Sequence, residues 1–198
     1  REEIEQAMRM LARLHERVFE RWGGLYDEAP KSRAQYVLQY LRGDILYYLR
    51  KIERVFQLEW TQPELNAIWK NFESLAVEIF HGHPLPFRLI HGDVSPRNFA
   101  VGKDSRIHML DFLTVRADLA GWEIVKACIA LTRDCPRHCR PAWEIYFDAA
   151  GEARWREFLG EAKLAFARFA LRELAHQRVR PAQAQAASIP TKRELMDW

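Results

Sequence analysis

Two acidic side chains and one carboxamide lie close together in the middle of the chain. Residues 89–98 read L-I-H-G-D-V-S-P-R-N and include Asp93 and Asn98, and Asp111 follows the apolar run 107–110. A carboxylate can orient a hydroxyl nucleophile, while oxygen ligands from separate segments can hold Mg²⁺ against phosphates. These residue types indicate phosphoryl transfer, with Asp93 suited to the hydroxyl and Asn98 and Asp111 suited to the metal.

Short extended segments are expected to bring these side chains together. The pattern predicts strands at 88–90, 99–101 and 107–110, an irregular loop at 91–97 and a turn at 102–105. Asp93 and Asp111 then flank a β-hairpin, so they can converge in space although they are separated in the sequence.

The motif resembles the protein-kinase-like superfamily, and within it the aminoglycoside phosphotransferase and choline kinase branch, whose loop reads H-G-D-x-x-x-x-N. Gly92 is typical of that branch, and the segment 110–112 (L-D-F) is similar to its metal-binding I-D-F segment. The resemblance implies the large, C-terminal lobe of a kinase-like fold, mainly α with a small central β-hairpin (α+β). Its catalytic loop would be 91–98 and its metal-binding loop 111–118.

The polar residues of the two loops take their roles from this resemblance. Asp93 would be the catalytic base, and Asn98 and Asp111 would bind Mg²⁺ together with ATP or another nucleoside triphosphate. His91 and Asp118 would support the loops. The expected reaction is phosphorylation of a hydroxyl on a small molecule; candidate acceptors are aminoglycosides, choline-like amino alcohols, homoserine and sugar derivatives.

The chain departs from the family pattern in several respects. Ser95, expected beside the cofactor phosphates, stands where relatives carry Lys or His, which weakens any contact to the transferred phosphate. Leu113 replaces the glycine that is usual after D-F in protein kinases. No G-x-G-x-x-G stretch and no V-A-x-K-like strand occur, so the N-terminal small lobe is expected to be missing. We therefore expect a fragment that binds nucleotide poorly and turns over slowly on its own.

Two other functions remain open. A kinase-like binding or scaffold protein without catalysis, akin to the kinase-like proteins of bacterial spore coats, would also account for Ser95, Leu113 and the missing lobe. A metallohydrolase using His91, Asp93 and Asp111 is the weaker alternative, because such sites generally recruit more histidines at ligand spacing.

The composition favours one compact domain. The 198 residues are 48% hydrophobic and carry a net charge of +3 dispersed along the chain, which argues against nucleic-acid or membrane partners and makes a cytoplasmic location the default. The three cysteines and His138 lack the closely spaced pairs typical of zinc sites, so reduced thiols are expected.

Helical periodicity dominates outside the hairpin. Charged residues of the helices after residue 118, Glu123 and Lys126 among them, form a mixture of both signs that identifies no acceptor. Residues 1–178 are expected to form the lobe and 179–198 an extended or mobile tail. The predicted helices are 4–19, ending at Gly23-Gly24; 32–56, with a weak point at Gly43-Asp44; 61–81, begun by a capping box; and 119–131, 141–150 and 152–176.

Overall fold

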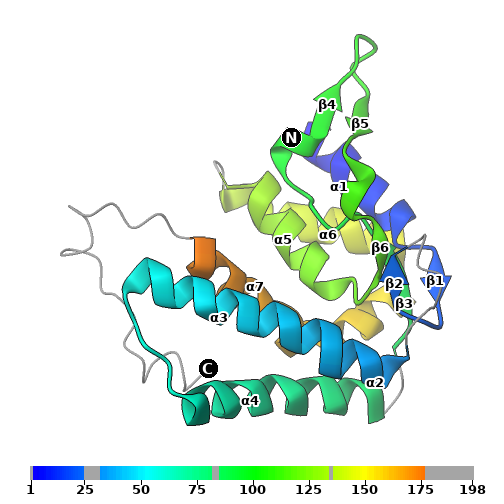
Figure 1. Cartoon of the computed structure of the whole chain (residues 1–198). Helices are drawn as coiled ribbons and strands as arrows, with labels where there is room; N and C mark the ends of the chain where they lie inside the picture. Colours follow the sequence, from blue (N-terminus) through cyan, green and yellow to red (C-terminus); the bar gives the residue numbers. More distant parts are fainter. Residues whose placement is uncertain (1, 25–31, 82–84, 134–135, 177–198) are drawn as a thin grey trace.

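The computed structural model describes residues 2–24, 32–81, 85–133 and 136–176, and the statements below concern those residues. Most of them are helical, and two small antiparallel sheets supply the strands. Figure 1 shows a two-stranded hairpin projecting at one end of the molecule and a long helix, α4, crossing the other end. The predicted mainly α class with a small β component is confirmed at this level.

A four-stranded antiparallel sheet fixes the position where the loop 91–98 begins. Its order is β1-β3-β6-β2, so β3 and β6 are the central strands although they lie far apart in the sequence. The loop leaves the end of β3, and the chain returns to the sheet through β6. The strands are β1 (Val18–Phe19), β2 (Gly23–Gly24), β3 (Phe87–Ile90) and β6 (Arg116–Asp118).

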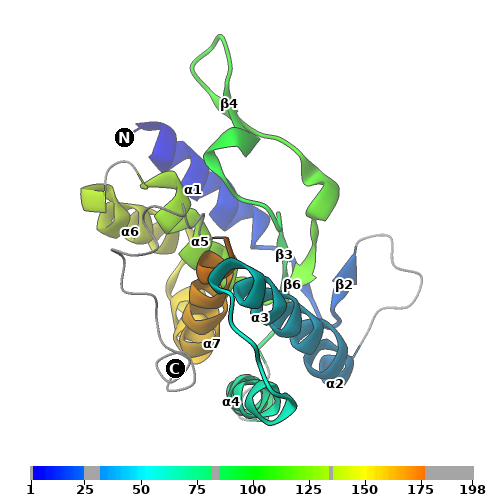
Figure 2. The same cartoon turned by 60° about the vertical axis from the view of Figure 1, so that its left-hand side comes forward.

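The predicted central hairpin is confirmed. It consists of β4 (Phe99–Val101) and β5 (Ile107–Met109), and a single 3₁₀ turn at Pro96–Asn98 leads into it. Figure 2 shows the tip of the hairpin projecting beyond the helices, while β5 at its base contacts α1. Since the hairpin begins just after Asn98 and ends just before Asp111, it brings the two loops next to each other.

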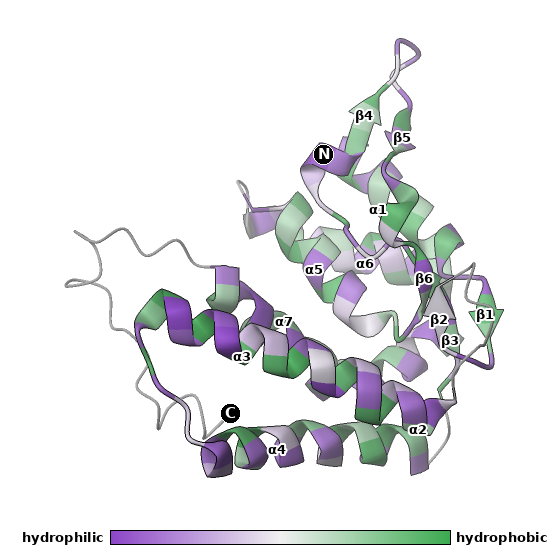
Figure 3. Cartoon of the chain, viewed as in Figure 1, coloured by the Kyte–Doolittle hydropathy of each residue, from purple (hydrophilic) through white to green (hydrophobic). Residues whose placement is uncertain are grey.

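The helices enclose two hydrophobic cores. One core lies among α3, α4 and α7, and the other among α1, α5 and α6. Hydrophobic and hydrophilic residues alternate along the helices (Figure 3), as expected where each helix buries one face. The helices are α1 (Glu2–Leu14), α2 (Arg33–Gln35), α3 (Arg42–Phe56), α4 (Gln62–His81), α5 (Gly121–Leu131), α6 (Cys139–Ala150) and α7 (Glu152–His176).

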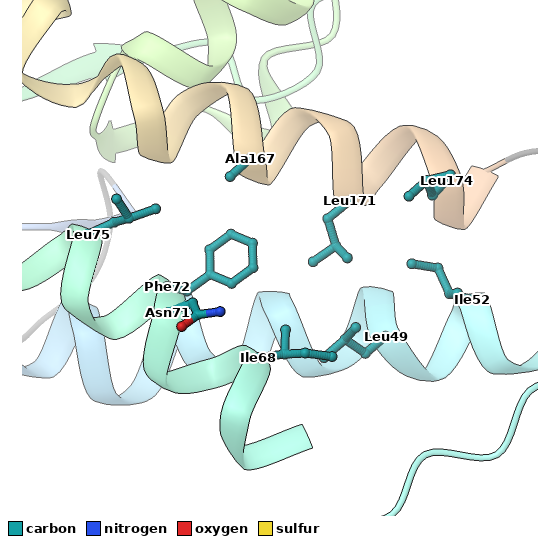
Figure 4. A pocket seen from close by; sticks show the side chains of 9 residues that line it. All are labelled: Leu49, Ile52, Ile68, Asn71, Phe72, Leu75, Ala167, Leu171 and Leu174. Carbon is teal, nitrogen blue, oxygen red and sulfur yellow. The ribbon is translucent and has the colours of Figure 1, made fainter. Parts of the chain in front are cut away.

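The core between α3, α4 and α7 is incompletely filled. A small cavity of about 40 Å³ remains there, lined almost entirely by aliphatic and aromatic side chains, with Leu171 of α7 pointing into it (Figure 4). In the part of the chain described, no helix combines the length and the apolar character that crossing a membrane requires.

The prediction of one helix from residue 4 to residue 19 is wrong at its end. Helix α1 stops at Leu14, and Val18 and Phe19 form β1, where Phe19 lies opposite Phe87 of β3. A β-branched and an aromatic residue fit a strand well, and pairing with β3 outweighs the helical spacing of their side chains. Gly23 likewise belongs to a strand, β2, instead of ending a helix.

The other helices follow the predictions closely. A π-helical stretch at Tyr36–Leu41 precedes α3, so the irregularity lies just before the predicted weak point at Gly43. The capping box before α4 is confirmed, because the Thr61 backbone N–H donates to Glu64 at 2.7 Å. Helix α7 has the predicted bounds. The predicted tail, 179–198, and Cys135 lie outside the described residues.

Candidate active site

The loop that carries Asp93 needs a glycine at its second position. Gly92 has φ 84°, in the left-handed region that favours glycine. A Cβ added there would collide with the carbonyl oxygen of Thr114 and would lie 2.8 Å from the Arg116 guanidinium. The loop can therefore pack against the segment before β6 only with glycine at position 92, which is a physical reason for the H-G-D sequence.

A buried carboxylate on α5 holds the backbone of this loop. Glu123 accepts hydrogen bonds from the backbone N–H groups of His91, at 2.9 Å, and Gly92, at 2.6 Å. It is also 3.0 Å from Nε2 of His15, in the turn that directly follows α1. Burial alone would raise the pKa of Glu123, but the hydrogen bonds from His15 and from the two backbone amides lower it. Glu123 is a buried anion that fixes the loop to α5.

His15 extends this contact to a third helix. Its Nδ1 lies 2.7 Å from the hydroxyl of Tyr146 on α6. Burial lowers the pKa of His15 in spite of the neighbouring Glu123, so the ring is neutral. We assign the proton to Nε2, which donates to Glu123, while Nδ1 accepts from the Tyr146 O–H. The end of α1 is thereby joined to α5 and α6 behind the loop 91–98.

The carboxylate of Asp93 is surrounded by donors. Lys126 Nζ, on α5, donates to Oδ1 at 2.8 Å, and Arg97 and the Asn98 amide each donate to Oδ2 at 3.2 Å. The side chain remains 26% exposed. Partial burial would raise the pKa of Asp93, but the hydrogen bond and charge of Lys126, followed by the bonds from Arg97 and Asn98, lower it to about 2. Asp93 is therefore ionised at neutral pH.

Two hydrogen bonds join the loop 91–98 to the segment that carries Asp111. The Leu110 N–H donates to the Asn98 carbonyl at 2.8 Å, and His91 Nε2 donates to the Leu110 carbonyl at 2.7 Å. Asp111 is exposed, has left-handed backbone angles, and makes no hydrogen bond or ion pair with another described residue. Of the predicted residues, Asp93 and Asn98 are hydrogen-bonded to each other. Asp111 directly follows Leu110, whose N–H donates to the Asn98 carbonyl.

Asn98 and Asp111 offer ligands suited to Mg²⁺. The Asn98 amide nitrogen donates to Asp93, so Oδ1 is the atom left to bind a cation. Mg²⁺ is usually held by one or two protein oxygens together with waters and substrate phosphates. The side-chain chemistry of the pair suits such a site, although no cluster of three or more His, Cys, Asp or Glu residues suited to a metal occurs in residues 2–24, 32–81, 85–133 and 136–176.

Asp118 is fully buried and is connected to the loop 91–98 through intermediate residues. Its Oδ1 accepts from the Tyr36 hydroxyl at 2.8 Å and its Oδ2 from Arg116 Nε at 3.2 Å. Arg116 also donates to the Thr114 carbonyl at 3.1 Å, and the Thr114 hydroxyl donates to the His91 carbonyl at 2.8 Å. The direct contacts to the loop backbone from α5 come from Glu123, which the sequence analysis had not singled out.

Sequence reasoning missed the two residues of α5 that hold the loop. Glu123 and Lys126 were expected among the mixed helical charges, but they are only 0% and 3% exposed. Helix α5 packs against α7 and the loop, so residues 121–128 are all buried. Their spacing of three places both side chains on one helix face. Isolated charges in an otherwise apolar helix are the signal that could have identified them.

Comparisons with known proteins agree with the geometry at the level of the family. Residues 1–158 match the phosphotransferase enzyme family. Searches of curated proteins and of solved structures found no significant match. Because the matched region covers most of the chain and includes both loops, this protein belongs to the phosphotransferase enzyme family.

Proposed function

We propose that this protein transfers the terminal phosphoryl group of ATP, or of another nucleoside triphosphate, to a hydroxyl group of a small molecule. The observation that carries the proposal is a partly exposed carboxylate, Asp93, in a loop whose backbone amides are bound by the buried Glu123. An acceptor hydroxyl needs a carboxylate held in this way for its orientation. Membership in the phosphotransferase family supports the same class of reaction.

In the proposed reaction, Asp93 accepts a hydrogen bond from the acceptor hydroxyl. The hydroxyl oxygen forms a bond to the γ-phosphorus, the bond from that phosphorus to the β–γ bridging oxygen breaks, and ADP leaves with the electron pair. The hydroxyl proton passes to the Asp93 carboxylate. Mg²⁺ held by Asn98 and Asp111 would neutralise phosphate charge.

The ionisation of Asp93 agrees with this role. A carboxylate whose pKa is lowered to about 2 is a weak base, so it orients the hydroxyl and takes the proton late, when the bond to phosphorus has largely formed. Late proton transfer suits a loose transition state, in which the hydroxyl needs little activation before attack.

We further propose that residues 1–178 are the C-terminal lobe of a kinase-like fold, with catalytic loop 91–98, metal-binding loop 111–118, and His91 and Asp118 as supporting residues. The His91 ring, which bonds the Leu110 carbonyl, supports this assignment because it bridges the two loops. By the same resemblance, a small lobe over the nucleotide would complete the site.

A non-catalytic binding or scaffold protein is the second candidate. The observation that favours it is the resting state of Asp93, whose carboxylate is already engaged by Lys126 and Arg97. In that case the charged cluster would serve the stability of the loop, and nucleotide turnover would be absent.

An isosteric substitution at the base tests the proposal. Asp93→Asn is expected to lower Mg²⁺-dependent ADP formation by about 10²-fold or more, because it removes the proton acceptor. The assay uses ATP with a panel of aminoglycosides, choline, homoserine and simple sugars. Asp104→Asn, in the exposed turn of the hairpin, is the matched control and should stay within about twofold. Undiminished turnover by folded Asp93→Asn protein would eliminate the mechanism.

A further inference from the structure

A buried lysine on α5 is not used by the reaction as described so far. Lys126 is 3% exposed, and its ammonium lies 2.8 Å from Asp93 Oδ1 and 5.7 Å from the centre of the Trp122 ring. No other hydrogen bond of this ammonium is found with the described residues, although an ammonium has three donors. Lys126 therefore retains donor capacity beside the carboxylate that would receive the acceptor hydroxyl.

Burial of this ammonium needs an explanation beyond packing. The neighbouring residues of α5, Ile124, Val125, Ala127 and Cys128, are all buried and apolar, so an apolar side chain at 126 would suit the helix. An ammonium removed from water loses several kcal/mol of hydration, which a single ion pair only partly offsets. Burial lowers the pKa of Lys126 even though Asp93 opposes this effect. A functional requirement for the charge explains why lysine stands there.

The catalytic loop itself is poor in positive charge near the base. Ser95, two residues after Asp93, has a neutral hydroxyl that is buried and has no hydrogen-bond partner among the described residues. The cationic side chain of Arg97 is 78% exposed, so water screens its charge. Phosphoryl transfer depends strongly on positive groups placed at the phosphate oxygens. Lys126 is a buried cation within hydrogen-bond distance of the base.

The two oxygens of the Asp93 carboxylate differ in how many further hydrogen bonds they can accept. Oδ2 already accepts from Arg97 and Asn98, whereas Oδ1 accepts only from Lys126 in the described structure. Each carboxylate oxygen has two lone pairs, so Oδ1 is the better site for an acceptor hydroxyl. A hydroxyl bound there, and the phosphoryl group it attacks, would then lie next to the ammonium of Lys126.

From these contacts we propose that Lys126 is a catalytic residue of this site, supplying from α5 the cation that the loop lacks at Ser95. In the resting protein its ammonium binds Asp93 Oδ1; with nucleotide bound, it also donates to an oxygen of the transferred phosphoryl group. Lys126 gives up no proton, and the bonds formed and broken are those of the proposed phosphotransfer, on which this inference rests.

Removing the lysine from α5 and introducing one in the loop tests the proposed role of Lys126 directly. Lys126→Met is expected to reduce Mg²⁺-dependent ADP formation by about 10²-fold, and adding Ser95→Lys to that variant is expected to recover about tenfold, because it restores a cation near the phosphate. Lys163→Met, an exposed lysine on α7, is the matched control and should stay within about twofold. Thermal unfolding verifies that each variant is folded.

The ammonium can also be observed in the unmutated chain, which avoids dependence on the folding of variants. With ¹⁵N-labelled lysine, the Lys126 Nζ resonance is expected to shift when Mg²⁺-ATP is added. If saturation with Mg²⁺-ATP produces no shift of this resonance, the inference is overturned. It is also overturned if Lys126→Met turns over ATP as fast as the wild type, or if adding Ser95→Lys to Lys126→Met restores none of the lost turnover. A full-length wild-type protein that neither binds nor turns over Mg²⁺-ATP overturns the proposed phosphotransfer as well, which separates the two failures.

Discussion

Replacing Glu123 by glutamine is expected to destabilise the protein by about 2–4 kcal/mol. The carboxylate accepts three hydrogen bonds, from His15, His91 and Gly92, and all three donors are buried or partly buried. Glutamine keeps one acceptor oxygen, so in either orientation of the amide at least one backbone N–H faces an NH₂ group. An orphaned buried donor costs roughly 1–3 kcal/mol, and the bonds that remain lose the assistance of a negative charge.

Urea unfolding followed by circular dichroism measures this loss as a shift of the midpoint at constant slope. Glu144→Gln on α6 is the matched control, because Glu144 is 56% exposed and pairs only with Arg140 one turn away. Its loss should stay within about 0.5 kcal/mol. If Glu123→Gln lowered the stability no more than Glu144→Gln does, the view that Glu123 anchors the loop 91–98 would be refuted.

Two further predictions concern the core. Because burial holds the pKa of His15 below its ordinary value of 6.5, the native state binds fewer protons than the unfolded state, and its stability falls as the pH drops below about 6.5. His15→Gln should therefore flatten urea midpoints measured between pH 7.5 and 5.5, and an unchanged slope would show that His15 is not the group responsible. Leu171→Ala, which enlarges the cavity between α3, α4 and α7, should cost about 2–5 kcal/mol, against less than about 1 kcal/mol for Leu159→Ala at an exposed position of the same helix. Equal losses in the two leucine variants, again by urea unfolding, would contradict the packing described.

The sequence predicted most of the helical structure because local signals and packing agree there. The capping box at 61–64 starts α4, and the apolar spacing over 152–176 matches α7 to its ends. The prediction failed at Val18 and Phe19, whose spacing fits a helix. Their partner in β1 pairing is β3, almost seventy residues later, and no local pattern reveals such a partner.

In the candidate site, too, contacts between residues close in the sequence could be predicted, whereas contacts between distant segments could not. Asp93 and Asn98 lie five residues apart in one loop, so their contact could be expected from the motif. Glu123 and Lys126 belong to a helix that begins after the loop has ended. A charged residue on a helix is normally solvated, and only the packing of α5 against the loop shows that these two are buried.

A single helix sets the position of the proposed base through two contacts of opposite charge. Glu123 fixes the backbone at the start of the loop, and Lys126, one turn later, fixes the Asp93 carboxylate. Helix α5 is itself held closely against α7, since a Cβ added to Gly121 would lie 2.7 Å from Glu161. The geometry of the base is therefore determined by helix packing in the core, and the loop needs no bound nucleotide to acquire it.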